Sequence, residues 1–212
     1  MAGFSCRQKG AVNITQGEIY YNIEYVGDFA VPKDFLPKNL IVSFKDDKIL
    51  FEMTGMVNSG IVLLTNPEKE IFDTYFSLPP FRYYYAGKPG EVYPGFEAMD
   101  GMIITKTSKT ATICGLNCNN AVVTFPNDRH KKVDIWYTDE IKMKNPNISS
   151  PFHQIEGVLM SFFFLMGSTE LHFYAESVFG KEIPDATFKR KDKFDRVSRE
   201  NIEKLINKMG SD

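Results

Sequence analysis

The sequence contains few of the residues that most often carry chemistry. Its 212 residues include only 3 histidines, 3 cysteines and 1 tryptophan. The histidines, His130, His153 and His172, lack the spacing of a metal site. No glycine-rich stretch is followed by the Gly-Lys-Ser or Gly-Lys-Thr of a phosphate-binding loop. We therefore expect no metal, no cofactor and no enzymatic activity.

An excess of one charge and long apolar runs are missing as well. Lysine and arginine number 25 and aspartate and glutamate 27, which gives a net charge of −2. Such a chain has no overall positive field to attract nucleic acid. The basic run at 189–193 is short and is predicted to be a solvated linker. No apolar run approaches the roughly 20 residues of a transmembrane helix.

Aromatic residues, by contrast, are abundant, with 18 Phe and 10 Tyr in a chain that is 14% aromatic. They favour β-strands, and from residue 17 onward short alternating segments follow one another with only turns between them. Helical crossovers do not fit into such short connections, so the strands are predicted to be antiparallel. Near the end, Ser198 caps a segment in which Ile202, Leu205 and Ile206 recur at helical spacing.

These patterns predict a mainly β fold in a single domain at 17–212, after a flexible leader at 1–16. The expected architecture is a curled antiparallel sheet or half-barrel of about ten strands with a C-terminal helix. Because one amphipathic helix cannot cover so many strands, the sheet must curl onto itself.

The stretch at 157–167 carries no charge and is bracketed by glycines. Read as a strand, its side chains alternate between two faces. One face carries Val158, Met160, Phe162, Phe164 and Met166, and the other carries Leu159, Phe163 and Leu165. A strand that is apolar on both faces has to be covered on both. It is either a central core strand or a strand of which one face lines an apolar cavity.

Tyr83 and Tyr85 precede the longest irregular segment, a loop at 87–95 rich in glycine and proline. They either close over the mouth of a pocket or pack against the edge of the sheet. Methionine and aromatic side chains suit an adaptable apolar site. The candidate ligand-binding residues are therefore Met160, Phe162, Phe164, Met166, Tyr83 and Tyr85.

The cysteines have two candidate roles. Cys114 and Cys118 flank a predicted three-residue turn and could face each other across a hairpin, as a disulfide in an exported protein or as two buried thiols. Ser5 and Cys6, followed by polar residues, resemble the end of a bacterial lipoprotein signal. Cys6 is then the lipidated residue that anchors the protein to a membrane. The alternative is an ordinary start followed by a disordered leader.

Two segments carry a family resemblance. Residues 112–125 read TICGLNCNNAVVTF and residues 133–141 read VDIWYTDEI. Both resemble an exported bacterial family of unknown function that is related to the GLPGLI proteins, and the similarity covers about 113–188. The segment at 153–159, HQIEGVL, departs from the GLPGLI signature itself. The resemblance implies export, a mostly antiparallel sheet and the half-barrel of LolA and LolB lipoprotein carriers, which bind acyl chains in an apolar concavity.

Two functions remain. In the first, the chain is a non-enzymatic envelope protein, periplasmic and anchored to the outer membrane, whose concave sheet binds a lipid, an acyl chain or another apolar molecule. In the second, the core is fully packed and the chain is a structural or protein-interaction module of the envelope. That module would use exposed aromatic residues such as Trp136 and Tyr20.

Overall fold

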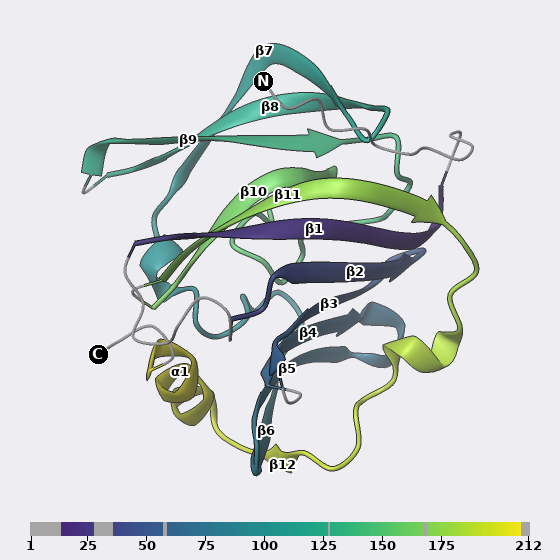
Figure 1. Cartoon of the computed structure of the whole chain (residues 1–212), viewed down its shortest axis with the longest axis vertical. Helices are drawn as coiled ribbons and strands as arrows, with labels where there is room; N and C mark the ends of the chain where they lie inside the picture. The colour runs from purple at the N-terminus through teal and green to yellow at the C-terminus, as the bar shows by residue number, and fades with distance from the viewer. Residues whose placement is uncertain (1–13, 28–35, 57–58, 127, 168, 209–212) are drawn as a thin grey trace.

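The computed structural model describes residues 14–27, 36–56, 59–126, 128–167 and 169–208. Its strands form one 12-stranded sheet in the order β12-β6-β5-β4-β3-β2-β1-β11-β10-β9-β8-β7 (Figure 1). The strands are β1 (Gln16–Val26), β2 (Asn39–Lys45), β3 (Lys48–Thr54), β4 (Gly60–Asn66), β5 (Ile71–Leu78), β6 (Phe81–Ala86), β7 (Ile103–Ile113), β8 (Leu116–Phe125), β9 (Asp128–Thr138), β10 (Val158–Met166), β11 (Thr169–Gly180) and β12 (Asp195–Arg196). The sheet curls without closing, and the described residues form a single α-helix, α1 (Arg199–Lys208).

The predicted mainly β fold, with a curled sheet and a C-terminal helix, is confirmed. Neighbouring strands are antiparallel except β12 and β6, which pair in parallel. The sequence predicts separate strands at 102–107 and 110–114, whereas β7 is one strand with an irregular register between Lys106 and Thr110. β12 was not predicted, because a strand of only two residues has no alternation to detect.

One face of the sheet, here called the inner face, carries the larger core cluster. From β1, the inner face carries Ile19, Tyr21 and Ile23, which follow the predicted alternation. The concavity is filled by the segments between the strands, which contribute Phe96, Met99, Phe152 and Ile155, all buried. The inner face is therefore packed over most of its area.

β10 occupies the centre of this packing. Phe162 contacts Tyr21, Phe152, Phe164 and Phe173, with ring centroids 4.8–6.3 Å apart. Phe163, on the other face, is also fully buried and contacts Phe125 and Phe152. The strand is thus covered on both faces, as its apolar sequence requires.

The predicted alternation along this strand is wrong at its start. Leu159 pairs with Tyr137 and Ser161 pairs with Trp136, so Met160 is an extra residue in a bulge. A bulge inserts one residue and shifts the side chains before it to the opposite face. Met160 therefore does not continue the face that carries Phe162.

The outer face of β3, β4 and β5 has a core of its own. Leu50, Val62, Leu64 and Tyr75 are covered there by the segment at 181–194, which inserts Phe188. This segment includes the basic run at 189–193, which was predicted to be a solvated linker. That prediction is wrong for Arg190 and Lys191.

Arg190 and Lys191 are held by acidic side chains on the strands beneath them. Arg190 donates to both carboxylate oxygens of the fully buried Asp73, at 2.7 and 3.1 Å. Lys191 pairs with Glu52 at 3.0 Å. A bidentate arginine compensates a buried carboxylate that would otherwise be costly to desolvate. Two residues of the run are therefore paired with acidic side chains on β3 and β5.

Helix α1 begins after Ser198, whose hydroxyl accepts a hydrogen bond from the Asn201 amide at 3.3 Å, so the predicted cap is present. Ile202 and Ile206 are buried against the inner-face core. A Cβ at Gly95 would lie 2.8 Å from Ile206, so this loop position needs glycine for the helix to dock. The described part of the chain contains no helix long and apolar enough to span a membrane.

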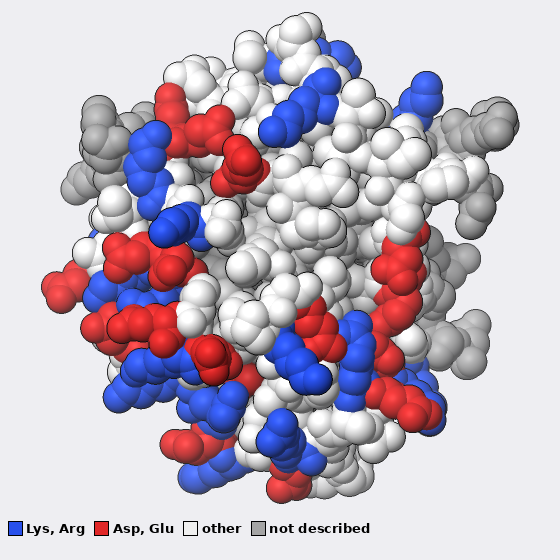
Figure 2. All heavy atoms as spheres, turned by 180° about the vertical axis from the view of Figure 1, so that it is seen from behind, with Lys and Arg blue, Asp and Glu red and all other residues white. Residues whose placement is uncertain are grey.

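The surface behind the view of Figure 1 carries no extended field of one sign. In Figure 2, lysine and arginine are interspersed with aspartate and glutamate around the lower and left margins, and a broad uncharged area lies between them. This agrees with the near-balance of 25 basic and 27 acidic residues in the sequence.

The packing around Phe162 generates the first prediction. Phe162→Ala is expected to lower the free energy of unfolding by about 3–5 kcal/mol, because it leaves a cavity among four aromatic rings. The control is Phe81→Ala, since the Phe81 side chain is 54% exposed; its effect is expected to stay within about 0.5 kcal/mol. Urea unfolding measures both. Equal losses in the two variants would contradict a packed centre.

Candidate functional site

An apolar recess lies at one end of the curled sheet, where several strands begin or end. It is lined by Tyr25, Leu36, Pro37, Met53, Gly60, Ile61, Met166, Thr169, Leu171 and Ile206. These residues come from the ends of β1, β3, β4, β10 and β11, from the segment before β2, and from α1. Helix α1 contributes Ile206 to this lining.

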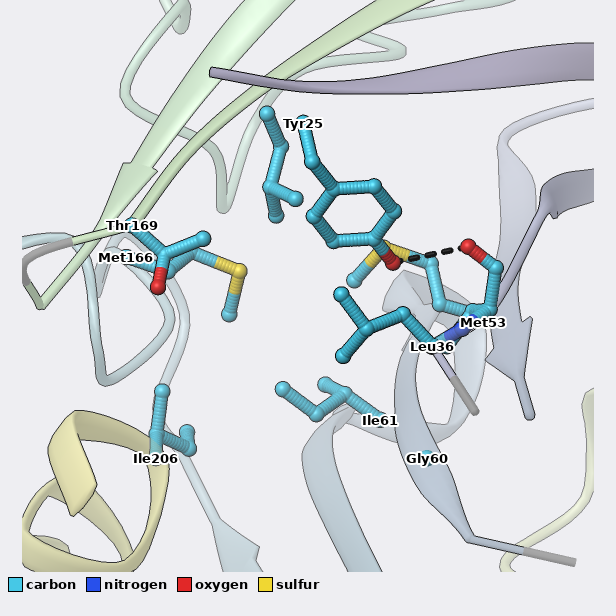
Figure 3. Close-up of a pocket in the computed structure, with 10 residues that line it drawn as sticks. Tyr25, Leu36, Met53, Gly60, Ile61, Met166, Thr169 and Ile206 are labelled. Atoms are coloured by element: carbon cyan, nitrogen blue, oxygen red, sulfur yellow. Dashed lines mark hydrogen bonds between the residues drawn. The ribbon is translucent and has the colours of Figure 1, made fainter. Parts of the chain in front are cut away.

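Figure 3 shows how the lining side chains are arranged. The thioethers of Met53 and Met166 approach the recess from opposite sides, and Leu36, Ile61 and Ile206 extend into the space between them. Methionine is unbranched and polarizable, so it adapts to differently shaped apolar groups. The two methionines give this recess walls that can adjust.

The polar groups of the recess are few, and the main one is already engaged. The Tyr25 hydroxyl donates to the Pro37 carbonyl at 2.7 Å (Figure 3). Burial raises the pKa of Tyr25 above its usual range, so the phenol stays protonated at neutral pH. No lining side chain is charged. The recess therefore has no group suited to accept a proton or attack a substrate near pH 7.

The size of the recess limits what it can hold. Its volume is about 60 Å³, whereas a dry cavity of about 150 Å³ accommodates a benzene molecule. A whole lipid does not fit. The end of an apolar chain fits, with the remainder of the molecule outside the recess.

Helix α1 closes one side of the recess through Ile206. Its C-terminal turn docks on the β10–β11 connection, where a Cβ at Gly167 would lie 3.1 Å from the Asn207 Cα. Gly167 has a φ of 60°, a left-handed conformation that glycine adopts without cost. Next to it, Met166 is thereby held at the edge of the recess.

The structure distributes the four predicted residues of β10 over different surroundings. Met166 lines the apolar recess. Phe162 and Phe164, each 2% exposed, lie in the aromatic cluster with Phe96 and Phe173. Met160 lines a second hollow, described below. A ligand in the recess would meet Met166 and not the two phenylalanines.

The two predicted tyrosines lie on β6, near the edge of the sheet, and both are half-buried. The Tyr83 ring stacks on Phe81, with centroids 6.2 Å apart. The Tyr85 hydroxyl donates to the Glu91 carboxylate at 2.9 Å, and Arg199 donates to the same carboxylate at 2.8 Å. Tyr85 thereby helps to fix the loop after β6 to the start of α1.

Cys114 and Cys118 do not face each other across the hairpin. The turn consists of Cys114 and Gly115, with φ of 52° and 76°, and not of the three residues that the sequence suggested. Cys118 pairs with Ala111 across the hairpin, and both cysteine side chains are buried thiols. The Cys114 thiol donates to the Ala175 carbonyl at 3.4 Å. Of the two predicted alternatives, a disulfide and two buried thiols, the structure shows two buried thiols.

Other predicted residues lie elsewhere. Cys6 falls outside the described residues. The ring of Tyr20 contacts Phe179, and the Tyr20 hydroxyl donates to Glu18 at 2.7 Å. Trp136 is half-buried and lines the second hollow. Within the described residues, no group of three or more His, Cys, Asp or Glu side chains is placed to hold a metal ion.

Most of the recess was not predicted. Met53 and Ile61 belong to segments that were predicted to be strands, but the pattern of apolar residues does not reveal which end of a strand stays uncovered. Ile206 belongs to the predicted apolar stripe of the helix, and the stripe does not indicate what it covers. Leu36 lies in a segment read only as a connection, and no local signal marks it.

Comparison with known proteins finds similarity in fold, without similarity in sequence that would show a family. No protein-family model and no curated protein sequence matches this chain, so the relationship to the GLPGLI proteins stays a prediction. Two crystal structures of PNGF-II are similar, with TM-scores of 0.56 and 0.55 and 16% identity, covering 91% and 90% of this chain. The chain spans only 33% and 32% of the length of those proteins.

A LolA superfamily protein, NE2245 from Nitrosomonas europaea, is also similar, at a TM-score of 0.37 and 12% identity, over 84% of this chain and 91% of its own. A likeness this low carries no argument about fold or function.

The buried thiols generate the second prediction. In a Cys6→Ser background, a thiol reagent at pH 8 is expected to modify neither Cys114 nor Cys118 while the protein is folded. They are 6% and 1% exposed, and burial raises the pKa of Cys118 to about 11, which keeps it out of the reactive thiolate form. After unfolding without reductant, mass spectrometry should find both modified. Finding neither modified would mean that they are bridged.

Proposed function

We propose that this chain is a non-enzymatic binding protein of the cell envelope, and that its recess receives the end of an apolar ligand such as an acyl chain. The observation that carries this proposal is the uncharged lining of the recess, with Met53 and Met166 on facing walls. The absence of charge among these ten lining residues removes the usual means of acid–base catalysis there. The volume of about 60 Å³ restricts the ligand to a short inserted end.

A specific observation favours a second candidate, a structural or protein-interaction module. The centre of the concavity is occupied by Phe96 and Phe152, which contact Phe164 with ring centroids 4.6 and 6.2 Å away. A carrier that encloses a whole acyl chain needs that space.

Binding of an acyl probe distinguishes the two candidates and is the third prediction. A dansyl-labelled undecanoic acid should bind the wild-type protein saturably. Met166→Gln should weaken binding by about tenfold, because the ligand end would then meet a polar amide that it cannot satisfy. Met56→Gln is the matched control, since Met56 is 54% exposed and does not line the recess. Thermal unfolding checks that both variants fold.

The alternative outcomes of this experiment are equally informative. If the wild-type protein shows no saturable binding, the recess is not a ligand site and the interaction module is the better account. If Met166→Gln and Met56→Gln behave alike, the probe binds somewhere else.

Export and anchoring form the second part of the proposal: we place the protein in the periplasm, attached to the outer membrane through a lipid on Cys6. The support is Ser5-Cys6 ahead of a polar stretch in the sequence.

The fourth prediction tests this anchor. In the native host, Cys6→Ala is expected to move the protein from the membrane fraction to the soluble fraction, because the acylated residue is lost. Gln8→Ala should leave the distribution unchanged. Equal retention of wild-type protein and Cys6→Ala in the membrane fraction would reject Cys6 as the anchor.

A further inference from the structure

A second hollow lies on the outer face of the sheet, and it shares no lining residue with the recess. Its volume is about 860 Å³, within the range of about 300–1,000 Å³ that is usual for small-molecule pockets. It is lined by Asn22, Glu24, Thr112, Ile113, Cys114, Gly115, Trp136, Met160, Ser161, Tyr174, Ala175 and Glu176. Four strands and the tip of the β7–β8 hairpin meet there.

The hollow forms where β10 changes partners. β10 pairs with β9 from Val158 to Ser161 and with β11 from Ser161 to Met166. Beyond this fork the Ala175 carbonyl of β11 receives the Cys114 thiol of the hairpin tip. The sheet therefore opens at the fork, and the hairpin tip forms one wall of the opening.

Two bulges border the same opening. Met160 is the extra residue of β10. On β11 the register skips Glu176, because Tyr21 pairs with Ala175 and Tyr20 pairs with Ser177. Both extra residues line the hollow. Bulges redirect side chains and are over-represented next to binding and active sites.

Two aromatic side chains stand on either side of a small residue. Ser161 is paired with Trp136 on one neighbouring strand and with Tyr174 on the other, so the three side chains share a face. Strands lie about 4.8 Å apart, which places the two aromatic residues about 10 Å apart along the sheet. A compact group in contact with both rings needs about 7–8 Å between them. Ser161 leaves the space above it open.

The charge of the hollow has one sign. Glu24 and Glu176 are its charged lining residues, and none of the lining residues is lysine or arginine. Burial and the neighbouring Glu24 carboxylate raise the pKa of Tyr174, so the two side chains interact. Aromatic ring faces are also electronegative and attract cations. Carboxylates and ring faces thus favour a positively charged guest.

We propose that this hollow binds an organic cation, a quaternary ammonium group held between Trp136 and Tyr174 with Glu24 and Glu176 as its counter-charges. The group occupies the space above Ser161. Asn22 and Thr112 lie at the margin, where they can donate hydrogen bonds to the polar remainder of the ligand. A neutral sugar also suits aromatic and amide side chains, but it does not complement the negative charge of the hollow.

The experiment uses the intrinsic fluorescence of Trp136, the only tryptophan of the protein. Choline chloride should change its emission saturably, beyond sodium chloride at equal ionic strength. The neutral isostere 3,3-dimethylbutan-1-ol should bind at least about tenfold more weakly, because it has the same shape without the charge. Isothermal titration calorimetry gives the affinity independently of the fluorophore. Cellobiose tests the sugar.

The choline titration is the fifth prediction, and variants test whether choline binds in the hollow. Glu24→Gln and Tyr174→Ala should each weaken choline binding by about tenfold, and Ser161→Leu should abolish it by filling the slot. The matched controls are Glu68→Gln and Phe179→Ala, which lie outside the hollow and should bind as the wild-type protein does. Circular dichroism confirms that each variant is folded.

Three results would overturn the proposal. They are no saturable response to choline, equal or tighter binding of the alcohol or of cellobiose, and unchanged choline affinity in both Glu24→Gln and Tyr174→Ala.

Discussion

The structure depends on the need to bury a strand that is apolar on both faces. Phe162 and Phe164 extend from one face of β10, and Phe163 from the other, and all three are buried. A flat sheet with one helix could not enclose them, so the sheet curls and the segments between strands fill its concavity. Phe152 shows how closely the two requirements are linked, since its ring contacts all three phenylalanines.

A filled centre moves the usable space to the margins of the sheet. On the inner face a recess lies at the ends of several strands, and α1 contributes Ile206 to it. The outer face has room where β10 passes from one neighbour to the other. The Tyr25 hydroxyl bonds to Pro37 at the first place, and the Cys114 thiol bonds to Ala175 at the second.

Local patterns predicted the strands, the helix with its Ser198 cap and the curl of the sheet, because alternation and capping act within a few residues. They failed where one residue breaks the period. Nothing in the sequence marks Met160 or Glu176 as an extra residue, yet these two bulges shape the outer hollow. They failed also for distant partners. Arg190 reads as part of a solvated basic run, and its buried partner Asp73 lies 117 positions earlier. Of the apolar recess, Met166 was among the predicted candidates, and its neighbours from other strands were not.

The apolar recess and the outer hollow differ in chemistry and in position. Their separation along β10 indicates that they act separately. Met166 at the recess and Met160 at the hollow are six residues apart on β10, which corresponds to about 20 Å along a strand. The recess and the hollow also lie on opposite faces of the sheet. A single amphiphile with a cationic head and an apolar tail would have to pass around the sheet to reach both. The interlocked rings of Phe162, Phe164 and Phe173 lie between the two sites, and a core packed at this density resists small displacements. Binding at one site is therefore expected to leave the affinity of the other unchanged.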